Sequence, residues 1–267
     1  MSEIYRCLPG NSPLLVSVPH CGTRIPDHLA ARMTPAALAL ADTDWHVDRL
    51  YDFAPDLGAH MLMANFSRYV ADLNRDPAGT PLYPGADNTE VVPLHTFDRL
   101  PIYRASEEPK ANELRRRIDV YWKPYHDRVQ HELERLKERY GFAILFDAHS
   151  IRSQVPRFFE GRLADFNLGT AKGASMEAAL ASRLLGVCQE ASGYSSVLDG
   201  RFTGGYITRC YGRPAQGVQA VQLELAQLIY MDEAPPFRFR PELAERIQPI
   251  LRRVLEELLA WAKARAS

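Results

Sequence analysis

Runs of apolar, mostly branched side chains alternate along the chain with stretches in which apolar residues recur every three or four positions. The first pattern indicates buried strands and the second amphipathic helices, and their alternation is typical of an α/β protein. The predicted strands cover residues 14–18, 60–64, 69–73, 142–146, 205–209 and 218–225. The predicted helices cover residues 36–40, 42–54, 111–140, 175–185 and 241–264. No internal repeat, low-complexity tract or linker interrupts the pattern, so we expect residues 1–267 to form a single domain.

The longest helical pattern, over residues 111–140, contains a proline and is followed by a glycine. Pro124 predicts a kink in this helix, and Gly141 predicts its end. Three consecutive arginines at 115–117 would suit a nucleic-acid-binding surface. Acidic residues are interleaved with the basic ones along the whole helix, however, which favours an ordinary solvated face.

Residues 76–109 hold many of the prolines and few periodic apolar positions, so they are predicted to form a long loop. Compact domains rarely keep such a loop without a functional reason. We therefore expect this segment to act as a lid over a site.

Composition narrows the class of protein. Lysine and arginine number 32 and aspartate and glutamate 33, and 46% of the residues are hydrophobic, which is typical of a soluble globular chain and not of a disordered or DNA-binding one. No run approaches the ~20 apolar residues of a membrane span, and the N-terminus does not read as a signal peptide. The four cysteines are scattered, which favours free thiols in the cytoplasm. The glycine-rich phosphate loops and the G-x-S-x-G elbow are absent, so the common nucleotide-binding and serine-hydrolase motifs are missing.

Two histidines end strand-like runs. His20 follows LLVSVP, and His149 follows AILFDA. Sites of α/β sheets form at the carboxyl ends of strands, and histidine is the commonest zinc ligand, so the pair favours a metal site. Taken singly, each histidine is better explained as a hydrogen-bonded structural residue, and it is the pair in matching positions that shifts the interpretation towards metal. His126 and His131 are five positions apart on the long helix, point in different directions, and are expected at the surface.

The third metal ligand is expected in the segment DTDWHVD, which begins at Asp42. A catalytic zinc needs three protein ligands and an open position, and Asp44 is our preferred candidate, with His46 and Asp48 as alternatives. A calcium loop is excluded, because the glycine and glutamate required at its sixth and twelfth positions are missing. A simpler interpretation is that Asp42 or Asp44 caps the following helix.

One carboxylate falls inside the apolar run VQAVQLEL, which is predicted to be a buried strand. Burying a carboxylate without a partner is costly, so Glu224 is expected either to pair with an arginine in the core or to be functional. In the second case it is the candidate general base for a metal-bound water.

Asn74 and Arg75 follow the predicted strand at 69–73. The planar guanidinium group of arginine can bind a carboxylate through two parallel hydrogen bonds, so Arg75 is a candidate ligand for a carboxylate of the substrate. Pairing with Asp72 or Asp76 is the alternative.

Taken together, these segments resemble the N-formylglutamate deformylase family along nearly the whole chain. The resemblance rests on SVPHCGTRIP (17–26), DTDWHVDRLYDF (42–53), ANFSRYVADLNRDP (64–77), FDAHSIRSQVPRFFEGRLADFNLGT (146–170), GGYITRCYGRPAQGVQAVQLELAQ (204–227) and the terminal helix. Several long motifs in the right order make the match specific.

The resemblance implies a three-layer α/β/α fold with a mixed, mostly parallel central sheet, like that of the zinc exopeptidases (phosphorylase/hydrolase-like). It also implies one Zn²⁺ per chain, or another divalent transition metal. The implied metal ligands are His20, Asp44 and His149, the implied catalytic residue is Glu224, and the implied substrate-binding pair is Asn74 and Arg75. One departure is that the wider exopeptidase pattern H-x-x-E is broken here by Thr23, so the carboxylate ligand must come from elsewhere.

The implied reaction is hydrolysis of N-formyl-L-glutamate to formate and glutamate, in histidine degradation. The substrate carries two negative charges and needs more than one cation, so Arg152, Arg209 and Arg213 are candidates for its second carboxylate. No nucleic-acid or membrane partner is expected. Two alternatives remain: a zinc amidase acting on other N-acyl amino acids or on peptidoglycan amides, and a non-catalytic sensor of formylglutamate.

Overall fold

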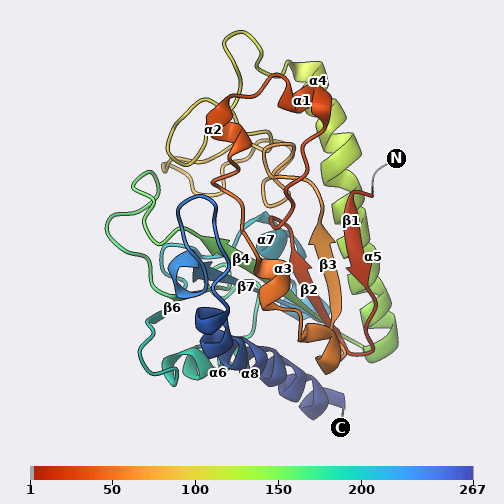
Figure 1. Cartoon of the computed structure of the whole chain (residues 1–267). Helices are drawn as coiled ribbons and strands as arrows, with labels where there is room; N and C mark the ends of the chain where they lie inside the picture. The colour runs from red at the N-terminus through yellow and green to blue at the C-terminus, as the bar shows by residue number, and fades with distance from the viewer. Residues whose placement is uncertain (1–2, 267) are drawn as a thin grey trace.

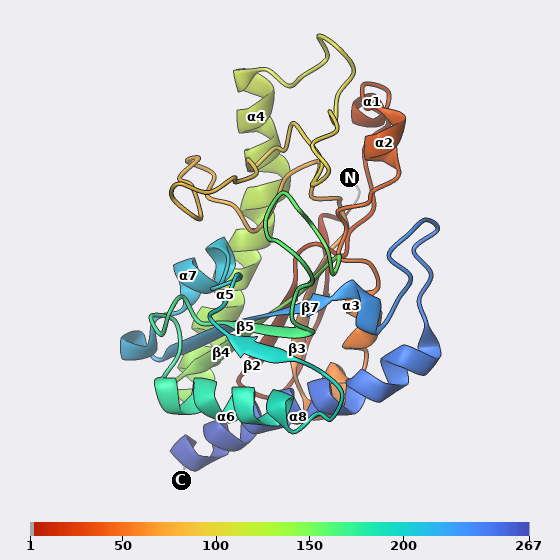
Figure 2. The same cartoon turned by 90° about the vertical axis from the view of Figure 1, so that its left-hand side faces the viewer.

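The computed structural model describes residues 3–266, and in them seven strands form one mixed sheet (Figures 1 and 2). The strands are β1 (Tyr5–Leu8), β2 (Leu14–Val18), β3 (His60–Ala64), β4 (Ala143–Ile151), β5 (Phe166–Gly169), β6 (Ser196–Leu198) and β7 (Val218–Ala226), in the spatial order β1-β3-β2-β4-β7-β5-β6. The central strands β3, β2, β4 and β7 are parallel. Strands β1 and β5 run antiparallel to their neighbours, and β6 is parallel to β5. The predicted mixed, mostly parallel sheet is confirmed.

Helices cover both faces of the sheet and complete three layers. They are α1 (Asp27–Ala30), α2 (Pro35–Leu38), α3 (Val47–Leu50), α4 (Ala111–Arg117), α5 (Lys123–Tyr140), α6 (Ala178–Gln189), α7 (Tyr206–Tyr211) and α8 (Pro241–Ala266). Successive residues of β4 point to opposite faces. Leu145 packs in one apolar cluster with Val129 of α5, while Ile144 and Phe146 pack in another with Leu255 of α8. No helix of the described residues has the length and apolar character needed to cross a membrane.

The long helical pattern is confirmed over 111–140, but its irregularity lies one turn before the predicted kink. Ile118–Trp122 form a π-helical turn between α4 and α5. Pro124 lacks an N–H and its ring would press on the carbonyl of the preceding turn, and a wider turn relieves both effects. Helix α5 then ends at Gly141 with φ +81°, as expected for a left-handed helix end.

Three sequence predictions were wrong. Residues 69–73 form turns and not a strand, and residues 205–209 belong mostly to helix α7. In both places buried apolar side chains contact neighbouring segments, so tertiary packing overrides the local pattern. The predicted helix 42–54 shrinks to α3 and a short 3₁₀ turn, Ala54–Leu57, and neither candidate aspartate caps α3. The short strands β1, β5 and β6 were missed.

Residues 76–109 form the predicted long loop, without a helix or strand. Together with α1 and α2 this segment lies beyond the carboxyl ends of the parallel strands (Figure 2). The fold therefore places the loop on the edge of the sheet where His20 and His149 were expected.

Candidate metal centre

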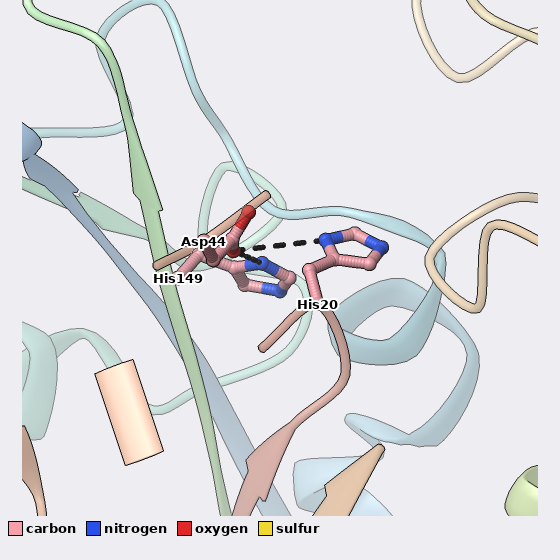
Figure 3. Close-up of side chains that lie close together, drawn as sticks. All are labelled: His20, Asp44 and His149. Carbon is pink, nitrogen blue, oxygen red and sulfur yellow. Dashed lines mark hydrogen bonds and ion pairs between the residues drawn. The ribbon is translucent and has the colours of Figure 1, made fainter. Parts of the chain in front are cut away.

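His20, Asp44 and His149 converge on one point, as the sequence predicted (Figure 3). His149 lies inside β4, and His20 lies two residues beyond β2. The Asp44 Oδ2 atom is 2.9 Å from His149 Nδ1 and 3.7 Å from His20 Nδ1, and one ligand atom from each residue lies within 4.8 Å of the others. All three side chains are buried.

Asp44 is held in place through its main chain and its carboxylate. Its N–H donates to the His20 carbonyl at 3.1 Å, and its Oδ2 accepts from the Ser150 N–H at 3.2 Å. The two alternative ligands are engaged elsewhere, because His46 Nε2 bonds to the Phe237 carbonyl at 2.7 Å and Asp48 pairs with an arginine near the N-terminus. Asp44 is thus the acidic residue of this segment that joins the histidine pair.

The outer nitrogens of both imidazoles are fixed by carboxylates. His20 Nε2 is 2.8 Å from Asp72 Oδ1, and His149 Nε2 is 3.0 Å from Asp147 Oδ2. Such partners orient the ring and leave Nδ1, the nitrogen facing Asp44, as the ligand atom. Two imidazole nitrogens and one carboxylate are a donor set that suits a divalent transition metal such as zinc.

The charges around Asp44 keep it ionised. Burial alone would raise the pKa of its carboxyl, but the Arg68 guanidinium and the His20 imidazole outweigh burial and hold the pKa below its usual range. Burial likewise disfavours the charged form of His149, yet Asp147 and Asp44 raise its pKa well above the ordinary value. In the absence of metal, a proton therefore binds His149 in place of the cation.

Glu224 lies on β7 directly beside His149 in the parallel register. Its Oε2 accepts a hydrogen bond from Gln222 Nε2 at 3.1 Å, and no lysine or arginine of residues 3–266 lies within ion-pair distance of it. Burial raises the pKa of this carboxyl to about 7. Within the described residues, Glu224 therefore does not form the structural ion pair that was the alternative to a functional role.

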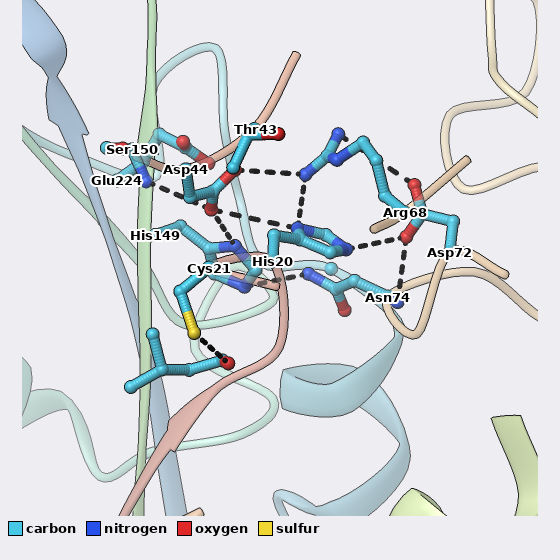
Figure 4. Close-up of polar contacts among 12 residues, drawn as sticks. His20, Cys21, Thr43, Asp44, Arg68, Asp72, Asn74, His149, Ser150 and Glu224 are labelled. Carbon is cyan, nitrogen blue, oxygen red and sulfur yellow. Dashed lines mark hydrogen bonds and ion pairs between the residues drawn. The ribbon is translucent and has the colours of Figure 1, made fainter. Parts of the chain in front are cut away.

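Asn74 and Arg75 both line the cavity. The Asn74 amide nitrogen lies 3.1 Å from His149 Nε2 (Figure 4), and the Asn74 Oδ1 atom accepts from the main-chain N–H of Ile207 at 2.8 Å. Arg75 donates to Thr89 and to the Asn74 carbonyl, and it forms no ion pair with Asp72 or any other acid of the described residues. Arg75 thus lines the cavity without a carboxylate within ion-pair distance, although its charge helps, after that of His20, to lower the pKa of the buried Asp72 carboxyl.

The three arginines proposed for the second carboxylate lie outside this cavity. Arg152 pairs with Asp98 at 2.8 Å, and Arg213 is exposed and donates to main-chain carbonyls. Arg209 lies close by, bonded to Gly204 and Thr203, which precede the lining residue Gly205.

Sequence reasoning missed Arg68, which is buried at the centre of the site (Figure 4). Its guanidinium donates to His20 Nδ1, lies 3.2 Å from Asp44 Oδ1, and stacks on the Phe97 ring at 5.0 Å. It also missed Asp72 and Asp147. His126, expected at the surface, is buried: its nitrogens bond to Tyr211 and to the Leu73 carbonyl, whereas His131 is exposed as predicted.

A signal for part of this set exists in the strands. On the face covered by α5, β4 begins with Ala143 and Leu145 and continues with Asp147 and His149. β7 changes in the same way, from Val218 and Ala220 to Gln222 and Glu224. A change from apolar to polar at alternate positions halfway along neighbouring strands marks where the core ends and the site begins.

The cavity is small, about 50 Å³, partly open to solvent, and lined in part by aromatic side chains. Its lining residues are His20, Arg68, Asn74, Arg75, Leu82, Tyr83, Phe97, His149, Ser150, Ile151, Phe158, Phe202, Gly205, Gln222 and Glu224. Leu82, Tyr83 and Phe97 come from the long loop 76–109. Polar groups, among them the two histidines of the candidate metal site, thus form the floor, and loop side chains contribute to the walls.

Comparison with known proteins agrees with this site. Residues 12–231 match the family model described as N-formylglutamate amidohydrolase. The chain is 53% identical to an N-formylglutamate deformylase of Pseudomonas aeruginosa and 49% identical to one of Pseudomonas putida, each over 265 residues and 99% of both chains. Among solved structures, an N-formylglutamate amidohydrolase from Ralstonia eutropha JMP134 matches with a TM-score of 0.82 and 26% identity, over 98% of both chains.

Proposed function

The chain belongs to the N-formylglutamate amidohydrolase family, and we propose that it hydrolyses N-formyl-L-glutamate to formate and L-glutamate, a step of histidine degradation. The observation that carries the proposal is the convergence of two histidines and one buried aspartate, with an unpaired glutamate that lines the same cavity as the two histidines. This arrangement suits hydrolysis of an amide better than ligand binding alone, because a sensor does not need a general base.

His20, Asp44 and His149 are the residues that would hold one metal ion per chain, with zinc as our first choice. A zinc ion in such a site supplies Lewis acidity and lowers the pKa of water to about 7. Asp72 and Asp147 would keep the two imidazoles in the tautomer that exposes Nδ1.

Glu224 is the proposed general base. Its carboxylate would take a proton from the attacking water and deliver it to the departing amine of glutamate. A base is most effective when its pKa is close to the working pH, and burial places that of Glu224 at about 7.

Arg68 is placed to stabilise charge on the formyl oxygen. It is fully charged, buried, and in contact with two of the three ligands. Once His20 Nδ1 serves as a ligand, the Arg68 N–H that donates to it is free to donate to the substrate. Preorganised donors in a dry site contribute strongly to acyl-transfer catalysis.

Arg75 is the proposed ligand for a substrate carboxylate, and Asn74 would assist it. His149 Nε2 lies 3.0 Å from Asp147 Oδ2 and carries the proton of that hydrogen bond, so it offers no lone pair to the neighbouring Asn74 NH₂ group. The Asn74 NH₂ group would donate to the substrate instead.

Substrate entry requires the cavity to widen. A volume of about 50 Å³ holds one or two water molecules, far less than formylglutamate needs. We propose that the loop 76–109 acts as the lid that moves. We also propose a cytoplasmic enzyme, in keeping with its four free cysteines.

One experiment tests the function directly. Purified protein is analysed for metal, formate release is measured with formylglutamate, formylaspartate and formylmethionine, and release of free glutamate is measured with acetylglutamate, each before and after chelation. We expect about one zinc per chain and a clear preference for formylglutamate that chelation abolishes. Release of no formate from any substrate by metal-replete protein would overturn the proposal.

A further inference from the structure

A second cavity, of about 360 Å³, adjoins the first and shares Leu82 and Tyr83 with it. Its charged lining side chains are Lys172, Arg201 and Arg209, and no acidic side chain lines it. A cationic cavity next to an amide-cleaving site is suited to an anionic part of the substrate.

The positive charges of this cavity are not neutralised within the described chain. Neither arginine forms an ion pair there, and neutral acceptors hold both: Arg209 Nε donates to the Gly204 carbonyl at 2.8 Å and Arg201 Nε to the Phe158 carbonyl at 2.5 Å. Asp199, beside the lining residue Gly200, is already engaged by Thr170 and by the main-chain N–H of Lys172. The guanidiniums are thus fixed in direction, with their charge available to a ligand.

Tyr83 forms the partition between the two cavities. The guanidinium carbons of Arg201 and Arg209 lie over its ring, 5.0 and 5.2 Å from the centroid, and its hydroxyl accepts from the Thr203 N–H at 3.3 Å. The inner cavity is too small for the whole substrate, so part of the substrate must extend beyond it. Movement of Tyr83 would join the cavities and free the guanidiniums, because a carboxylate is a stronger partner for them than an aromatic face.

We propose that Arg209, assisted by Arg201, binds the side-chain carboxylate of the substrate and so makes the enzyme specific for dicarboxylate formyl amino acids. The inference rests on the proposed function. The α-carboxylate is attached to the same carbon as the scissile amide nitrogen and must stay in the inner cavity, where Arg75 lies. The side-chain carboxylate is three carbons further out and extends into the outer cavity, where Arg209 lies.

The structure also separates Arg209 from the two other candidates. Arg152 already has a carboxylate partner in Asp98, and Arg213 is exposed and lines neither cavity. Arg213 is the same residue type four positions away along the chain, and its Nη1 donates to the main-chain carbonyl of Arg209. Arg213→Met therefore serves as a control that removes this main-chain contact and keeps the Arg209 guanidinium.

The test compares Arg209→Met with Arg213→Met on two substrates, N-formylglutamate and N-formylglutamine, which has the same shape and α-carboxylate but a neutral side chain. For Arg209→Met we expect kcat/KM to fall roughly 10- to 1,000-fold with formylglutamate and less than about threefold with formylglutamine. Arg213→Met should leave both values near those of the wild type. Arg201→Met should repeat the selective loss to a smaller extent.

Thermal unfolding and metal content check that each variant is folded. If Arg209→Met does not fold, Arg209→Lys replaces it, with a smaller but equally selective loss expected because the charge stays and the fork is lost. An equal loss on both substrates, or no loss, overturns this inference and leaves the proposed function standing. Failure of the wild type to release formate from either substrate overturns both.

Discussion

His149 and Glu224 lie directly opposite each other on the neighbouring parallel strands β4 and β7. Residues paired in this way point to the same face of the sheet, so the register alone brings the imidazole proposed to bind metal and an unpaired carboxylate together. A slip of one residue in either strand would turn its side chain to the opposite face. The apolar residues that precede both positions therefore have a functional role, since they fix this register.

Glu224→Gln should keep the fold and the metal but lose most turnover. The amide is nearly isosteric with the carboxylate but cannot accept a proton, and general acid-base groups contribute about 10²- to 10⁴-fold. Formate release under saturating substrate measures the effect, with Glu245→Gln on the exposed side of α8 as a control that should be silent. Turnover above about half of the wild-type rate would mean that Glu224 is structural.

His149→Ala should abolish metal binding while the protein stays folded. The change removes one of the three proposed ligands and leaves only His20 and Asp44. Metal content after dialysis and far-UV circular dichroism give the two readouts. The control is His46→Ala, which removes a histidine that contacts Phe237 and not the site, and it should retain metal. Equal metal content in all three proteins would contradict the assignment.

Arg75→Met should reduce recognition of the α-carboxylate and leave the metal in place. A hydrogen bond to a charged group is worth ~1.5–3 kcal/mol, and an unpaired substrate charge adds to the loss, so kcat/KM for formylglutamate should fall roughly 10- to 1,000-fold. N-formyl-4-aminobutyrate lacks the α-carboxylate and keeps the distal one. The wild type should hydrolyse this substrate with a low kcat/KM, and Arg75→Met should lower that value only a little further. If both substrates slow equally, Arg75 supports the structure or the chemistry instead.

His126 should make the protein less stable in mild acid. Burial, opposed only in part by the hydrogen bond to Leu73, lowers its pKa from 6.5 to about 4. Between these two pH values His126 is protonated in the unfolded chain but neutral in the folded protein. The free energy of unfolding therefore falls as the pH falls from about 6.5 towards 4. Because of His126, the free energy of unfolding should therefore be about 2 kcal/mol lower at pH 5 than at pH 7.

Urea unfolding at pH 7 and pH 5 measures this effect as a difference between wild type and His126→Gln. The glutamine cannot titrate, so its stability should change by about 2 kcal/mol less over the same interval. Identical changes in the two proteins would show that His126 is protonated in the folded state.

The sequence predicted the parts of the site that local pattern controls. His20 and His149 follow from apolar runs that end in a histidine, and Glu224 follows from a carboxylate inside such a run. In these cases the strand itself places the side chain. The alternatives His46 and Asp48 could be separated from Asp44 only by the structure, because a chain reversal at His46, with φ +64°, turns the three side chains to different neighbours.

Other parts depend on contacts that no local pattern carries. Tyr69 is buried because its hydroxyl donates to Asp42, and that bond joins two loops 27 positions apart. No local sequence pattern distinguishes Arg68 from a surface arginine. It belongs to the site only because the fold brings it into contact with His20 and Asp44. The apolar and branched residues around Ile207 suggested a strand, but the Asn74 side chain accepts from the Ile207 N–H and so ties that segment to the site as a helix.

The π-helical turn at Ile118–Trp122 rotates the two halves of the long helix relative to each other, so that each half directs its side chains to a different neighbour. An α-helix rotates by about 100° per residue, so one extra residue in a turn shifts everything before it by roughly that angle relative to everything after it. On the sheet side of the turn Tyr125 faces the core, and on the loop side Arg117 bonds to Tyr103. Within the turn itself the Trp122 indole donates to the Arg75 carbonyl at 3.0 Å. The extra residue in the π-helical turn thus sets the angle between the part of the helix that contacts the loop 76–109 and the part that packs on the sheet. A single insertion or deletion in this turn would rotate these two parts relative to each other while leaving the residues of each part unchanged.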